Sequence, residues 1–246
     1  PASVYETLVQ DVSIDYAMNF ETPTGWTVDN DPGLDDGAWN FGVPVNCDRG
    51  DPPADADGSG SAALTDNSAA SGCNSDVDGG ATTLVSPVMD ASDPDVAIEY
   101  YRWYSNSYGS NPGANIFTVE VSDDGGSTWS ELETVGPTGS EVNGGWYYKS
   151  FVVADIPDIT NTSAFRIRFT ASDIGSGAVV EAGVDGVTLV ALGCEEPSYD
   201  LTGDGVVNSD DLFQMLGQWG SCDECSADFN GDGVVDSTDL FQMLGA

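Results

Sequence analysis

Two acidic segments near the C-terminus repeat the same pattern of oxygen-bearing side chains. One begins at Asp200 and the other at Asp228, 28 residues later, and each runs into the same Leu-Phe-Gln-Met-Leu-Gly sequence. Oxygen ligands at positions one, three and five, a glycine at six and a carboxylate at twelve are how a 12-residue loop surrounds Ca²⁺. A solvated Asp-Gly turn would explain one copy. Two copies in register predict two calcium loops.

The second loop carries the fuller set of ligands. Thr202 offers only a neutral hydroxyl where the second loop has Asn230, so we expect the first site to bind calcium more weakly. Position seven would supply a backbone carbonyl, and position nine would act through a water molecule. The predicted ligands are Asp200, Thr202, Asp204, Val206, Asn208 and Asp211 in the first loop, and Asp228, Asn230, Asp232, Val234, Asp236 and Asp239 in the second.

The composition of the chain excludes several partners and most acid–base chemistry. It has 42 acidic and 5 basic residues, a net charge of −37 and no histidine. Nucleic-acid phosphates need lysine and arginine for neutralisation, and the lack of histidine removes histidine-based triads and zinc sites. No run of about 18 apolar residues exists that would span a membrane. We therefore predict a protein that binds divalent cations, is not an enzyme, and binds no nucleic acid.

Five cysteines in an acidic, glycine-rich chain indicate an extracellular or cell-surface protein. We predict a disulfide between Cys47 and Cys73, which share one loop-rich region. Cys194, Cys222 and Cys225 flank the calcium loops, and the sequence leaves their pairing open. The chain starts at Pro1 without a methionine or a signal-like apolar region, which indicates a mature or internal segment of a longer precursor.

Alternating apolar and polar residues predict a mainly β domain over residues 20–193, built as a sandwich. Turn residues separate the expected strands, which are 96–104, 116–122, 129–135, 146–153, 165–171 and 184–191. Residues 194–199 would be a linker and 200–246 a small helical domain. Residues 1–19 leave three alternatives open: a first strand of the β domain, a last strand of a preceding domain, or a strand that pairs with a neighbouring molecule.

Two further features of the β domain each have two interpretations. The long segment 29–80 is either a solvated acidic loop or one organised by a cation and a disulfide, because long unstructured loops are uncommon in compact domains. Its candidate ligands are Asp48, Asp51, Asp55, Asp57, Asp76 and Asp78. Trp103 and Trp146, with neighbouring tyrosines, are either half-buried strand residues or a platform for stacking sugars.

The tandem loops, each followed by one short helix, resemble dockerin domains. The resemblance implies a small β contact between Val207 and Val235, and a cohesin-type partner that binds the residues just after position nine. Those partner-binding residues are Ser209, Asp210, Ser237 and Thr238. It also implies that the two helices bury their apolar residues against each other, namely Leu212, Phe213, Leu216, Trp219, Leu240, Phe241 and Leu244.

Residues 20–192 resemble jelly-roll modules that lie C-terminal to metallocarboxypeptidase-like and related secreted bacterial surface proteins. The segments that carry the resemblance are 42–53, 65–80 and 141–147. It implies two packed antiparallel sheets, with a structural calcium held between Glu21 and Asp185.

Two functions fit these features. The first is a non-catalytic, calcium-binding structural protein that assembles through its ends, with a head-to-tail fibre as one form. The second is a carbohydrate-binding or targeting module of a secreted hydrolase, docked through its dockerin-like tail to a cohesin-type receptor. Both predict two calcium ions in the C-terminal domain, and one or more in the jelly roll is an open alternative.

Overall fold

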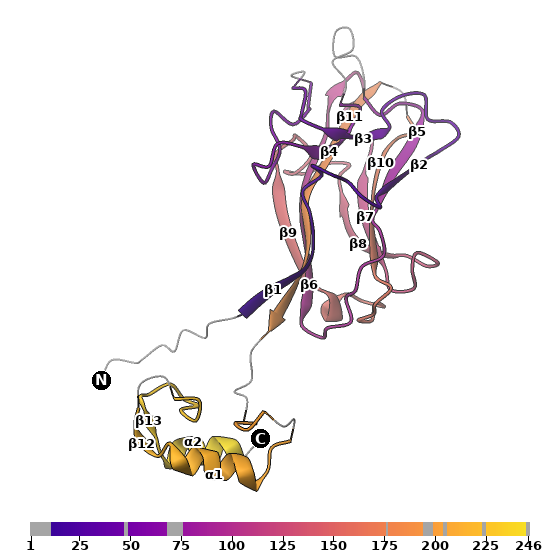
Figure 1. The fold of residues 1–246 in the computed structure, drawn as a ribbon. Coiled ribbons are helices and arrows are strands. Elements are labelled where there is room, and N and C mark those ends of the chain that lie inside the picture. Colours follow the sequence, from indigo (N-terminus) through magenta and orange to yellow (C-terminus); the bar gives the residue numbers. More distant parts are fainter. Residues whose placement is uncertain are drawn as a thin grey trace. The chain divides into compact units, whose positions relative to one another are not determined.

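A computed structural model describes residues 11–46, 49–67, 76–175, 177–193, 199–203, 206–222 and 225–244. The chain divides into two compact units (Figure 1). Val12–Gly193 forms the larger unit, called here the sandwich, and the described residues from Tyr199 onward belong to the C-terminal unit. Among the described residues, no helix is long and apolar enough to cross a membrane.

The sandwich consists of two antiparallel sheets. Sheet A has the strand order β3-β4-β11-β6-β9, with β1 also pairing with β11, and sheet B has the order β2-β5-β10-β7-β8. The strands of sheet A are β1 (Asp11–Met18), β3 (Trp39–Gly42), β4 (Ala62–Thr65), β6 (Val96–Gly109), β9 (Tyr147–Val152) and β11 (Ala178–Gly193). Those of sheet B are β2 (Thr27–Asn30), β5 (Gly80–Val85), β7 (Phe117–Ser122), β8 (Ser130–Val135) and β10 (Arg166–Asp173). A short 3-10 turn, η1 (Val153–Asp155), follows β9.

The strand order itself defines a jelly roll. From β4 onward, every connection crosses between the sheets except the β7–β8 hairpin. The strands thereby fall into the orders β4-β11-β6-β9 and β5-β10-β7-β8, which are the two interlocked Greek keys of a jelly roll. The predicted mainly β sandwich is confirmed, and β2 and β3 each extend one sheet beyond this set.

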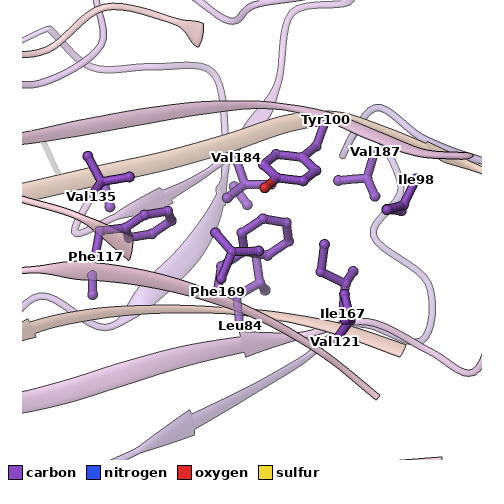
Figure 2. Close-up of a cluster of buried hydrophobic side chains, with 14 of the residues drawn as sticks. Leu84, Ile98, Tyr100, Phe117, Val121, Val135, Ile167, Phe169, Val184 and Val187 are labelled. Atoms are coloured by element: carbon purple, nitrogen blue, oxygen red, sulfur yellow. The ribbon is translucent and has the colours of Figure 1, made fainter. Parts of the chain in front are cut away.

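The core lies between the sheets because successive side chains of a strand point to opposite faces. In β10, Ile167 and Phe169 are fully buried while the intervening residues are half-buried. The Phe169 ring packs edge-on against Tyr100 of β6, with centroids 5.2 Å apart, and lies 6.4 Å from Phe117 of β7. Figure 2 shows these rings between the two layers. Burial of this kind is the main stabilising contribution to such a fold.

The sandwich begins earlier than residue 20, where the sequence placed its start. β1 pairs with β11, and Val12 already belongs to the larger unit. The hydroxyl of Tyr16 accepts a hydrogen bond from Trp26 Nε1 (2.8 Å), and Tyr16 and Met18 pack against the core. Of the three alternatives for this segment, residues 12–18 therefore form a strand of the sandwich itself. Residues 1–10 lie outside the described part of the chain.

The C-terminal unit contains two short helices and one small β ladder. The helices are α1 (Ser209–Gly217) and α2 (Ser237–Leu244), and the ladder joins β12 (Gly220–Ser221) to β13 (Val234–Val235). The expected contact between Val207 and Val235 is wrong, because Val235 pairs with Gly220 and Val207 is half exposed. Among the described residues of this unit, the buried hydrophobic core is small: Met215, Ala227, Val235 and Met243.

Candidate functional site

The second calcium loop of the C-terminal unit winds around its last carboxylate. Asp239 is fully buried. Its Oδ1 accepts hydrogen bonds from the backbone N–H groups of Phe229 (2.9 Å) and Asn230 (3.2 Å). Its Oδ2 accepts one from the backbone N–H of Asp236 (2.9 Å). The residue at position twelve therefore ties the beginning of the loop to its end.

The first loop repeats this arrangement 28 residues earlier. Asp211 is fully buried; its Oδ1 accepts from the Thr202 N–H (2.9 Å) and hydroxyl (3.0 Å), and its Oδ2 accepts from the Asn208 N–H (2.8 Å). Hydrogen bonds from the backbone N–H groups of Asn208 and Thr202 lower the pKa of Asp211 to about 2. The first loop thus keeps its closing ligand ionised, as a calcium site requires.

The other predicted ligands of the second loop lie close to one another. Asp228 Oδ2 accepts from the Gly233 N–H (2.8 Å), and Asn230 Nδ2 donates to Asp232 Oδ2 (3.2 Å). The Val234 N–H donates to Asp232 Oδ1 (2.9 Å). These oxygens suit a hard cation, but they take backbone and amide donors in this structure. Calcium binding would therefore include an exchange of partners by these side chains.

In the first loop, Asp200 Oδ1 accepts from the Gly203 N–H (2.7 Å), and the Val206 carbonyl accepts from Asn208 Nδ2 (3.1 Å). Asp204 lies outside the described residues.

The residues at position nine are helix N-caps as well as predicted calcium ligands. Asn208 Oδ1 accepts from the Asp210 N–H (2.8 Å), and Asp236 Oδ1 accepts from the Thr238 N–H (2.6 Å). Side-chain acceptors at this position satisfy N–H groups that a helix start leaves unpaired. The predicted partner-binding residues, Ser209, Asp210, Ser237 and Thr238, follow directly as the first residues of α1 and α2, and all four are exposed.

The prediction that the helices bury their Leu-Phe-Gln-Met-Leu faces against each other is wrong. Met215 and Met243 are the buried residues of these runs, and Leu212 and Leu240 are only partly buried. The aspartate and methionine four residues apart, Asp211–Met215 and Asp239–Met243, share one helix face, so the closing carboxylates determine which face turns inward. Apolar side chains remain exposed on the rest: Phe213 (67%), Leu216 (46%), Trp219 (48%), Phe241 (72%) and Leu244 (65%).

The sandwich contains its own group of gathered carboxylates. The ligand oxygens of Asp55, Asp57 and Asp185 lie within 4.8 Å of one another, and among the described residues no other group of three or more acidic or cysteine ligands meets this condition. Asp185, on β11, is fully buried, and its Oδ2 accepts from the N–H groups of Ala56 (2.8 Å) and Asp57 (3.2 Å). Burial raises the pKa of Asp185 to about 6, against the effect of these donors. Three carboxylate ligands fit a calcium ion well.

The resemblance paired Asp185 with Glu21, and the structure gives Glu21 a different place. Glu21 Oε1 accepts from the Ser61 N–H (2.5 Å), and Asp55 Oδ2 accepts from the Gly60 N–H (2.9 Å). Both carboxylates therefore fasten the same loop, but Glu21 is not one of the three gathered ligands. Asp55 and Asp57, both among the candidate cation ligands predicted in segment 29–80, complete the group.

The tryptophans of the expected sugar platform hold a loop in place. Trp103 Nε1 donates to the Gly50 carbonyl (2.6 Å), Trp146 Nε1 donates to the Ala54 carbonyl (2.8 Å), and the two rings pack edge-on 5.7 Å apart. A Cβ at Gly144 would lie 2.6 Å from the Trp103 ring, so backbone also covers that indole. These contacts favour the structural interpretation of both residues.

Of the cysteines, Cys222 and Cys225 form a disulfide beside β12. Cys47, Cys73 and Cys194 lie outside the described residues, so the predicted Cys47–Cys73 bond stays a prediction.

Comparison with known proteins gives similar folds and no family. No protein-family model and no curated protein matches the chain. Among solved structures, the chain resembles the K1 cleaved adhesin domain of Lys-gingipain from Porphyromonas gingivalis W83, with a TM-score of 0.46, 17% identity, and coverage of 72% of this chain and 98% of that one. It also resembles a carbohydrate-binding module specific for non-crystalline cellulose, with a TM-score of 0.40, 15% identity, and coverage of 70% and 91%.

A Stig cyclase from Fischerella sp. TAU matches about as well, with a TM-score of 0.41, 15% identity, and coverage of 72% and 88%. The fold assignment here rests on the sheet order, and the function has to be argued from the chain's own residues.

Proposed function

We propose that this protein is a secreted bacterial, non-catalytic binding module whose C-terminal unit docks onto a partner protein when calcium is bound. The observation that carries the proposal is the duplicated exposed surface of α1 and α2. Phe213 and Phe241 occupy the same repeat position, as do Leu216 and Leu244, and these four side chains are 46–72% exposed. Large exposed apolar side chains are typical of protein interfaces.

Calcium would act by folding this surface. The helices have 9 and 8 residues, which is too short for stability in isolation. In the described part of the unit, four buried hydrophobic residues supply little core. Ion binding between the beginning and the end of each loop would stabilise the unit as a whole. We expect one ion in each C-terminal loop and a third at Asp55, Asp57 and Asp185 in the sandwich.

Charge favours a partner of a different kind over a second copy. At a net charge of −37, two copies of this chain repel each other. A receptor with an apolar patch and a basic rim, of the cohesin type that the dockerin resemblance implies, would complement the surface. A head-to-tail fibre would have to overcome the repulsion through bound calcium.

The test uses the full chain and the double variant Phe213→Ser/Phe241→Ser, which alters only exposed side chains. Calcium titration followed by far-UV circular dichroism should show helix gained on binding in both proteins. Chemical cross-linking to candidate cohesin-type receptors should succeed for the wild type in calcium, and fail in chelator or with the variant. Equal cross-linking by wild type and variant would contradict the docking surface. Sedimentation velocity in calcium distinguishes self-association, since a fibre would give large particles and heterotypic docking a monomer.

The second function, carbohydrate binding by the sandwich, loses its expected platform, since Trp103 and Trp146 bond to the loop that covers them. Glycan-array binding that is lost in Tyr148→Ala, whose ring is half exposed on β9 beside Tyr101, would support it.

A further inference from the structure

The outer face of sheet A carries a second set of acidic residues, apart from Asp55, Asp57 and Asp185. On β11, Glu181 and Asp185 alternate with residues that point into the core, so both side chains lie on the outer face. Asp185 belongs to the gathered group. Glu181 lies four residues earlier, directly across from Ser105 of β6. Figure 1 shows β11 and β6 running side by side.

Glu181 is a buried carboxylate in acidic surroundings. It is 2% exposed, and the hydrogen bond to it comes from the Thr65 hydroxyl, which lies 3.1 Å from Oε2. Burial raises the pKa of Glu181 well above its usual range, and the charges of Asp51, Asp76 and Asp66 raise it further. Asp76 is itself 6% exposed, with Arg49 Nη2 3.9 Å from its Oδ1. Among the described residues, Arg49 is the cation that an ion pair places beside these carboxylates.

The hydroxyl of Ser105 lies on the same face of sheet A as Glu181 and has no hydrogen-bond partner among the described residues. Ser105 is fully buried. Because Ser105 is the cross-strand neighbour of Glu181, both side chains leave the sheet on the same side. Gly50 lies directly above it, since a Cβ there would be 2.5 Å from Ser105 Oγ. A buried hydroxyl without a partner needs an explanation, and a bound ion is one that also suits the neighbouring carboxylates.

We propose that Glu181, Asp51, Asp76 and the Ser105 hydroxyl bind a second divalent cation of the calcium class in the sandwich. Sheet A forms the floor of this site, and the segment 49–51 closes it, held by the bond from Trp103 Nε1 to the Gly50 carbonyl (2.6 Å). Carboxylates and a hydroxyl are the oxygen ligands that calcium takes. An ion here stabilises the ionised form of Glu181 and Asp76, which burial otherwise disfavours.

The two sandwich sites differ in how far they are formed in advance. Among the described residues, only Asp55, Asp57 and Asp185 already hold their oxygens within 4.8 Å of one another. The site at Glu181 therefore closes on its ion, and part of the binding free energy is used for that closure. It is the weaker of the two. The inference does not rest on the docking function of the C-terminal unit.

Calcium titration of the full chain by isothermal calorimetry tests the proposal. Glu181→Gln keeps the size of the side chain and the Thr65 bond, and should remove one weak ion from the stoichiometry. Asp57→Asn should remove a different, tighter ion, and the double variant should remove both. Glu120→Gln, which alters a half-buried carboxylate of sheet B bonded to Arg168, is the matched control and should bind as the wild type does.

Terbium is a second probe, since luminescence sensitised by Trp103 should fall severalfold in Glu181→Gln. Where Glu181→Gln does not fold, Asp51→Asn in the covering segment decides instead. Unchanged stoichiometry and unchanged terbium emission in the folded variant would overturn the site. Loss of the C-terminal ions in Asp211→Ala/Asp239→Ala leaves this outcome unaffected, so the two proposals fail separately.

Discussion

Asp173, at the end of β10, is a fully buried carboxylate of the sandwich whose hydrogen bonds, among the described residues, satisfy only one of its two oxygens. Its Oδ1 accepts hydrogen bonds from Asn115 Nδ2 (3.0 Å) and the Gly175 N–H (3.1 Å). Its Oδ2 is buried without a hydrogen-bond partner in the part of the chain that the structure describes. Burial raises the pKa of Asp173, and the charge of Asp78 adds to this, against the two hydrogen bonds. The folded state therefore binds this proton more tightly than the unfolded chain does.

This burial predicts a dependence of stability on pH. The folded-state pKa lies above the unfolded value of about 3.9, so the folded chain binds more protons in that range and loses stability as the pH rises through it. Asp173→Asn keeps the acceptor for Asn115 and removes the titration. The free energy of unfolding of the wild type, measured in chelator, should fall relative to that of Asp173→Asn as the pH is raised from 4 to 7. A constant difference would show that Asp173 does not titrate abnormally.

At the scale of elements, the prediction of two calcium loops stays a prediction, and the prediction of the buried helix faces is wrong. The spacing of Asp, Asn and Gly is local chemistry, so loop positions and helix starts follow from the sequence. The Leu-Phe-Gln-Met-Leu runs have several apolar residues and therefore no single obvious inward face. Their orientation is fixed by Asp211 and Asp239, whose burial in the loops turns Met215 and Met243 inward. Hydropathy alone therefore does not predict which face of each helix is buried.

In the sandwich, too, local patterns predict some features, and features that depend on distant contacts are missed. Strands such as 117–122 and 166–173 alternate clearly and were predicted to within a few residues. β11 was predicted only from residue 184, because its first half pairs with β6 over a continuously buried stretch that alternates weakly. The gathering of Asp55, Asp57 and Asp185 depends on contacts across some 130 residues of chain, which no local pattern encodes.

In α1 the Met215 face is buried and the Phe213 face is exposed, which predicts opposite effects of mutation at the two positions. Met215→Ala, at a fully buried position, should reduce the stability of the C-terminal unit by about 2–5 kcal/mol, enough to unfold a unit with so small a core. Phe213→Ala, two residues away and 67% exposed, should leave the unit folded. Far-UV circular dichroism in saturating calcium measures both. The reverse order of effects would show that the Phe face is the buried one.

At the scale of the whole molecule, the two units have separate cores and should respond separately to mutation. Phe169→Ala removes a fully buried ring between the sheets and should destabilise the sandwich by about 3–5 kcal/mol. Thr170→Ala, whose side chain faces outward on the same strand, is the control. Differential scanning calorimetry in calcium should show one transition shifted and the other unchanged. A shift of both transitions would show that the units are coupled.

The position of β11 also has a consequence for the making of the protein. It lies between β4 and β6 in sheet A, pairs with β1 as well, and is the last strand of the sandwich in the sequence. During synthesis, β4 and β6 therefore wait with open edges until residues 178–193 have left the ribosome. Such edges attract other chains, and pairings so distant in sequence form slowly. The central strand of sheet A is thus the last strand of the sandwich to be synthesised. Until it pairs with β4 and β6, the nascent chain is most prone to aggregation.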